Sequence, residues 1–92
     1  MSRAFVNEDA GATPEPTYDL PDPTSAYYPE AAAWALLQGA DQGDSVGAER
    51  ATGHRWGDPE LVPHVQAILE RAEAEDNGRL RQLARRFLRA AR

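Results

Sequence analysis

The sequence has no cysteine and no lysine among its 92 residues. Without cysteine, disulfides, cysteine-based zinc sites and a thiol nucleophile are excluded. No stretch approaches the about 20 consecutive apolar residues that a membrane-spanning helix needs. The first six residues, MSRAFV, contain no apolar signal core, so we expect a cytoplasmic protein. No segment alternates apolar and polar residues with a period of two, which argues against β-strands.

All ten basic residues are therefore Arg. Two explanations remain open. Arg suits forked pairing with carboxylates or phosphates, but Ala, Gly, Pro and Arg together also make 41 of the 92 residues, the bias of a GC-rich coding sequence.

Charge divides the chain into three unlike parts. Residues 1–30 carry six acidic residues and one Arg, residues 31–78 carry nine and three, and residues 79–92 carry six Arg and no acid. The net charge of −5 is thus an average over a molecule that is acidic over most of its length and basic at its end. The net negative charge argues against a protein that coats nucleic acid, whereas the basic residues 79–92 do not.

Residues 1–26 are predicted to form an acidic arm that is flexible or extended. Four prolines remove backbone donors and favour extended geometry, and apolar residues are too sparse to offset the entropy of ordering. The isolated apolar groups and their neighbouring acids suit a segment that docks on a protein partner or on its own domain: Phe5, Val6, Glu8, Asp9, Tyr18 and Leu20. If the arm packs across the helices predicted at 29–42 and 59–74, Tyr18 and Leu20 become core residues.

Residues 27–92 predict a small all-α domain of about four helices, arranged as two packed helical hairpins. Pro29 opens a helix that should end at Asp41 or Gln42 before Gly43, and a short helix capped by Asp44 or Ser45 should end at Gly53. Asp58, Pro59 and Glu60 begin the third helix, whose first turn should be 3₁₀ because Pro63 follows. Apolar residues at i, i+3, i+4 and i+7 then define two stripes, at Val62, Val65, Ile68, Leu69 and Ala72, and at Leu80, Leu83, Ala84, Phe87, Leu88 and Ala91.

Catalytic chemistry, metal sites and cofactors are not predicted. No Ser lies in a nucleophile motif, and His54 and His64 lack the i, i+4 spacing of two metal ligands on one helix face. The carboxylates at the predicted hairpin tips should serve solvation and capping: Asp41, Asp44, Glu73, Glu75 and Asp76. We therefore expect a protein that is not an enzyme.

The Arg-rich last helix offers two interpretations. Arg81, Arg85 and Arg89 share one ridge, with Arg86 and Arg92 beside it, and such a face can bind phosphate. Alternatively, the arginines favour the helix dipole and pair with Glu70 and Glu73 of the preceding helix.

Trp56 lies in a loop bounded by glycines, His54 to Asp58. It can anchor a partner, or it can close the core between the helices predicted at 45–52 and 59–74.

The residues MSRAFVNED at 1–9, followed by acidic and proline-rich sequence, resemble the N-terminal arm of some bacterial proteins of the Gre-type transcription elongation factor family. Residues 43–49, GDSVGAE, are more loosely similar to the coiled-coil tip of that family, whose acids hold magnesium. The resemblance implies a transcription-linked protein and carries the magnesium role to Asp44 and Glu49 alone. The β-rich polymerase-binding domain of the family has no counterpart here.

These features together favour a helical protein-interaction module, a monomer or weak homodimer without a membrane partner. RNA polymerase is a candidate partner, and nucleic acid bound by Arg81, Arg85, Arg86 and Arg89 is the alternative.

Overall fold

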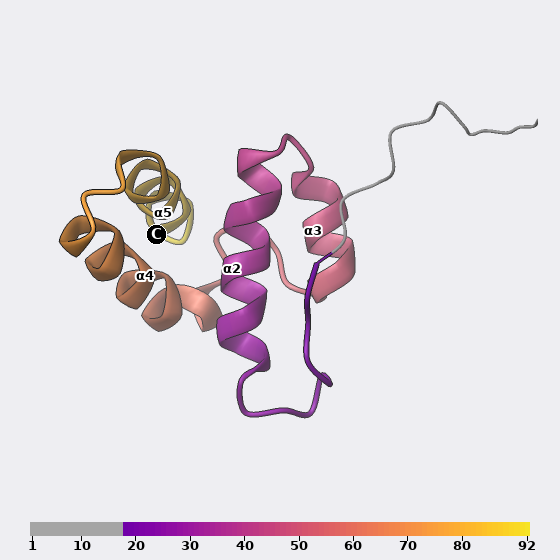
Figure 1. Ribbon diagram of the computed structural model, residues 1–92. Helices are drawn as coiled ribbons and strands as arrows, with labels where there is room; N and C mark the ends of the chain where they lie inside the picture. The colour runs from indigo at the N-terminus through magenta and orange to yellow at the C-terminus, as the bar shows by residue number, and fades with distance from the viewer. Residues whose placement is uncertain (1–17) are drawn as a thin grey trace, which may run out of the picture.

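The computed structural model describes residues 18–92, and these residues form helices without β-strands. The elements are α2 (Tyr28–Asp41), α3 (Ser45–Thr52), the 3₁₀ turn η1 (Pro59–Leu61), α4 (Val62–Ala74) and α5 (Gly78–Ala90). Helices α2 and α3 form one antiparallel pair and α4 and α5 form another, with α2 between α3 and the second pair (Figure 1). The predicted all-α fold of two packed hairpins is confirmed.

The helix boundaries follow the local signals in the sequence. Gly43 follows the C-cap residue of α2 and Gly53 is the C-cap of α3, with φ values of +73° and +74°, a conformation that favours glycine. The Asp58 side chain accepts a hydrogen bond from the Glu60 backbone N–H, and η1 precedes α4 as the position of Pro63 predicts. The Asn77 side chain accepts a hydrogen bond from the Leu80 N–H and so caps α5.

The core lies where α2 meets η1, α4 and α5. Its largest fully buried side chains are Phe87, Leu36, Leu37, Leu61 and Val65. The predicted stripes of α4 and α5 supply Val65, Ile68, Leu83, Ala84 and Phe87, while α2 contributes alanines as well as leucines. Because alanine side chains are short, α2 can approach several neighbours at once.

The segment before α2 is attached to the helical domain at Tyr18. The Tyr18 ring packs against the core, and its hydroxyl donates a hydrogen bond of 2.7 Å to Asp44 Oδ2. Leu20 is half-buried. Tyr18 therefore joins the α2–α3 pair, rather than crossing the helices predicted at 29–42 and 59–74. Asp44 is the N-cap residue of α3, as predicted, but its side chain binds Tyr18 and makes no cap hydrogen bond.

Gly39 permits the close approach of α2 to α3. A Cβ atom at this position would lie 2.5 Å from Ala48 Cβ, 3.0 Å from the Asp44 carbonyl oxygen and 3.2 Å from the Tyr18 hydroxyl. The first two neighbours belong to the α3 side of the packed pair and cannot rotate away. A side chain at residue 39 therefore requires the two helices to separate.

We expect Gly39→Ala to lower the free energy of unfolding by about 1–3 kcal/mol, because overpacking outweighs the helix propensity of Ala, worth roughly 1 kcal/mol. Urea unfolding followed by circular dichroism measures the difference. Gly78→Ala is the matched control, since its Cβ would meet nothing closer than the Arg81 guanidinium at 3.7 Å. Equal stability of Gly39→Ala and the unchanged protein would contradict the packing described.

Candidate functional site

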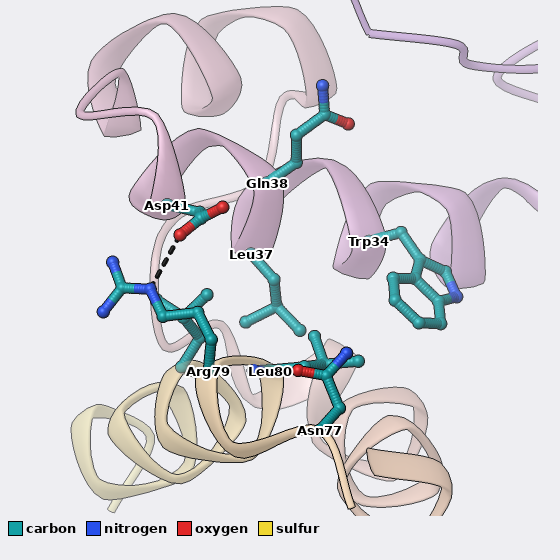
Figure 2. Close-up of a pocket in the computed structure, with 8 residues that line it drawn as sticks. Trp34, Leu37, Gln38, Asp41, Asn77, Arg79 and Leu80 are labelled. Atoms are coloured by element: carbon teal, nitrogen blue, oxygen red, sulfur yellow. Dashed lines mark hydrogen bonds and ion pairs between the residues drawn. The ribbon is translucent and has the colours of Figure 1, made fainter. Parts of the chain in front are cut away.

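An open groove of about 440 Å³ lies between α2 and the first turns of α5. Its wall on α2 comes from Trp34, Leu37, Gln38 and Asp41, which occupy positions i, i+3, i+4 and i+7 of one helix face. Its wall on α5 comes from Asn77, Arg79, Leu80 and Leu83. Figure 2 shows Trp34 and Leu37 on one side and Leu80 opposite, so the middle of the groove is apolar and polar groups lie around it.

An ion pair closes one end of the groove. Arg79 Nε donates to Asp41 Oδ1 at 2.7 Å, while Arg79 Nη1 donates to Gln82 Oε1 at 3.2 Å (Figure 2). Both charged side chains are about half exposed, at 52% and 50%. Near Trp34, the Arg71 guanidinium carbon lies 6.0 Å from the indole ring centroid. Two cations therefore stand beside the apolar surface, in contact with water.

The arginines of α5 are partly paired with acids of α4 and of the α4–α5 turn. Arg85 donates to Glu73 at 3.2 Å, so one of the two predicted partners on α4 is used, and Arg81 lies 3.8 Å from Asp76. Within residues 18–92, no carboxylate lies within 4.0 Å of the Arg86 or Arg89 guanidinium. The predicted ridge of Arg81, Arg85 and Arg89 does exist, and with Gly78 and Gln82 it borders a shallow hollow of about 390 Å³.

Trp56 packs into the domain. Its ring meets Phe87 of α5 edge-on, with 5.0 Å between ring centroids, and its backbone N–H donates to Glu49 Oε2 at 2.8 Å. The indole is half-buried and closes the core, although against α5 instead of between α3 and α4. This placement accounts for Trp56 without a partner.

The carboxylates at the hairpin tips each have a partner inside the fold. Asp44 accepts from the Tyr18 hydroxyl, and the others form ion pairs: Asp41 with Arg79, Glu73 with Arg85, Glu75 with Arg71 and Asp76 with Arg81. The family resemblance carries a magnesium role to Asp44 and Glu49. In the structure, their carboxylates accept hydrogen bonds from the Tyr18 hydroxyl and the Trp56 backbone N–H.

A second cluster of polar groups forms where the loop after α3 meets η1. His54 Nδ1 lies 2.8 Å from Asp58 Oδ2 and 3.9 Å from Glu60 Oε1. The hydrogen bond from His54 and then that from the Glu60 N–H lower the pKa of the Asp58 carboxyl. His64 is separate from this cluster and borders another hollow beside Trp34 and Glu30.

The remaining arm residues proposed from the sequence, Phe5, Val6, Glu8 and Asp9, lie outside the described residues. The α2–α5 groove itself was not predicted. A signal for it exists in the spacing of Trp34, Leu37, Gln38 and Asp41, but the pairing of that face with α5 requires the tertiary structure.

Comparisons with protein-family models, with curated proteins and with solved structures return no match to this chain. Among the helices of residues 18–92, none has both the length and the apolar composition required to cross a membrane.

The Tyr18–Asp44 contact predicts that the domain loses stability at alkaline pH. Burial, followed by the hydrogen bond to Asp44 and its negative charge, raises the pKa of Tyr18 from 10.0 to about 12. Because the folded state favours the neutral phenol, this contribution is complete below pH 10 and is lost as the pH rises towards 12. We expect roughly 1–2 kcal/mol of stability to disappear over that range.

Tyr18→Phe should remove this pH dependence and should cost about 0.5–1.5 kcal/mol below pH 10, because the hydrogen bond to Asp44 is absent. Urea unfolding at several values between pH 9 and pH 12 measures both effects. Tyr27→Phe serves as the control because Tyr27 is 74% exposed. A pH dependence that is unchanged in Tyr18→Phe would show that Tyr18 does not cause it.

Proposed function

We propose that this chain is a non-enzymatic helical module that binds another protein, and that the α2–α5 groove receives a segment of that partner. The observation that carries the proposal is an open apolar surface beside half-exposed cations, formed by two helices that the rest of the fold holds in place.

The size of the groove suits two apolar side chains. Of the apolar residues that line it, Leu37 and Leu83 are almost fully buried, while Trp34 and Leu80 are only half-buried. Burying one side chain of Leu or Phe size contributes roughly 1.5–3 kcal/mol. Two such side chains against a half-exposed Trp supply enough binding free energy for a specific contact, because a few aromatic and apolar anchors carry most of the energy of an interface.

Charge favours an acidic partner segment. The α5 wall belongs to the part of the chain with six Arg and no acid, and Arg79 lies at the end of the groove. The exposed pairs Arg79–Asp41 and Arg71–Glu75 contribute only about 0–1 kcal/mol each, so a partner carboxylate can join or replace them at little cost. The expected occupant therefore carries two apolar side chains next to Asp or Glu.

RNA polymerase is the partner that the resemblance of residues 1–9 suggests, and we propose a transcription-associated role on that basis. The arm residues Phe5, Val6, Glu8 and Asp9 would add a second contact with the same partner.

The groove is tested by the dissociation constant of a partner captured from the native host and then purified, with RNA polymerase as the first to be examined. Leu80→Ala should weaken binding roughly 5- to 30-fold, because it removes an apolar contact worth roughly 1–2 kcal/mol. Leu88→Ala is the matched control: it is also a half-buried Leu of α5 that packs on the core, but it does not line the groove.

Equal weakening by Leu80→Ala and Leu88→Ala would contradict the assignment of the groove. Two other occupants give different results. Concentration-dependent dimerisation that Leu80→Ala abolishes would assign the groove to a second copy, and tighter partner binding after deletion of residues 1–17 would assign it to the arm of the same chain. Either result would overturn the proposal that a partner segment is its occupant.

Deletion of residues 1–17 tests the arm separately. We expect less partner to be recovered with the shortened protein than with the full chain in the same capture experiment. Equal recovery would rule out the arm as a binding element and leave the groove as the docking surface.

Nucleic-acid binding is the second candidate function, favoured by the ridge of Arg81, Arg85 and Arg89 and by the absence of a carboxylate near Arg86 and Arg89 within residues 18–92. If it is correct, affinity for an oligonucleotide falls with salt, and Arg86→Ala/Arg89→Ala lowers the salt slope by about one for each phosphate that the variant no longer binds. Binding without salt dependence would exclude it.

A further inference from the structure

The loop after α3 brings three potential metal ligands to one point. His54, Asp58 and Glu60 each offer one atom, and these atoms all lie within 4.8 Å of one another. Two of the separations are 2.8 Å, from His54 Nδ1 to Asp58 Oδ2, and 3.9 Å, from His54 Nδ1 to Glu60 Oε1. From this geometry we infer that His54, Asp58 and Glu60 bind one divalent transition-metal ion of the zinc type. The inference does not depend on the proposed protein-binding function.

The two half-buried ligands are held in place by contacts outside the ligand set. The His54 backbone N–H donates to Thr52 Oγ1 at 3.1 Å, and its ring lies 6.2 Å from the Tyr28 ring between centroids. Tyr28 is fixed in turn by a 2.8 Å hydrogen bond from its hydroxyl to the Thr52 carbonyl. Such supporting contacts orient ligands and lower the cost of assembling a metal site.

Asp58 divides its carboxylate between two tasks. Oδ1 accepts the Glu60 N–H at 2.9 Å, and this bond leaves Oδ2 facing His54. Glu60 is different, because its side chain is 78% exposed and can move towards the other two ligands without disturbing the core. The site therefore combines two positioned ligands and one adjustable ligand.

The distances are close to those of a tetrahedral ion. Ligand bonds of about 2.0–2.2 Å to zinc place neighbouring ligand atoms roughly 3.4 Å apart. The His54–Asp58 separation must increase by about 0.6 Å, and the His54–Glu60 separation must decrease by about 0.5 Å, to reach that value. An ion binds Nδ1 through its lone pair, so the metal-bound imidazole carries its proton on Nε2.

The donor set selects the class of ion. An imidazole nitrogen suits zinc and its neighbours in the first transition series, whereas magnesium and calcium take oxygen ligands. Two carboxylates also balance the charge of a divalent cation. The positive charge of Arg55, which acts on Asp58, opposes binding of a cation. Three protein ligands leave a fourth coordination position to water. We therefore expect weaker binding than at a structural site with four protein ligands.

The test uses the full chain without an affinity tag and adds Zn²⁺ alone, with Mg²⁺ as a second titration. Calorimetry should show one Zn²⁺ per chain and no Mg²⁺ binding over the same concentration range. Glu60→Gln should weaken Zn²⁺ binding at least tenfold and leave the metal-free unfolding temperature unchanged. Glu70→Gln, which replaces an exposed glutamate of α4 outside the cluster, should bind Zn²⁺ as the unchanged protein does.

Imidazole ¹⁵N spectra locate the ion directly. Zn²⁺ should shift the Nδ1 resonance of His54 and leave both nitrogens of His64 unchanged. Absence of Zn²⁺ binding, unaltered affinity in Glu60→Gln, or a shift confined to His64 would each overturn the inference.

Discussion

The packing of α2 against its neighbours is the constraint on which the rest of the structure depends. Helix α2 contacts α3 on one side and η1, α4 and α5 on the other, so its faces are shared between the two hairpins (Figure 1). Gly39 allows α3 to lie close, while Leu36 and Leu37 join Leu61 and Phe87 in the hydrophobic core. A domain of this size buries a limited fraction of its surface, and a displaced α2 would open both hairpin contacts at once. The groove follows from the same arrangement, since the face of α2 that begins at Trp34 meets the first turns of α5 without filling the space between them.

Part of the uneven charge along the sequence is paired in the folded domain. The acids at the hairpin tips meet arginines from other segments, as Asp41 meets Arg79 and Glu73 meets Arg85. These exposed pairs add little stability, and Arg79 of the Asp41 pair lies beside the groove. Helix α5 supplies an apolar face for the core and a cationic face for solvent.

Sequence reasoning located the helices because their boundaries depend on local chemistry. Gly43, Gly53 and the Asp58–Pro59 pair act within one turn of the positions they control. Contacts between distant segments could not be predicted in the same way. The Tyr18–Asp44 hydrogen bond joins residues that are 26 positions apart. Trp56 contacts Phe87 because the tertiary structure brings α5 next to the loop after α3, so Trp56 closes the core against a different helix from the one expected. The groove depends on the relative placement of α2 and α5. The His54–Asp58–Glu60 cluster was missed because a loop and a 3₁₀ turn, not one helix face, bring its members together.

We propose that the α2–α5 groove is the surface on which a partner docks. The most direct test is an NMR titration of the labelled full chain with the purified partner, following the leucine and valine methyl groups, the tyrosine ring resonances and the tryptophan indole N–H resonances. We expect the largest changes to fall on Trp34, Leu37, Leu80 and Leu83, while the Trp56 indole changes little. Changes centred instead on the exposed side chains Tyr27 and Val46, with the groove resonances unmoved, would contradict the claim.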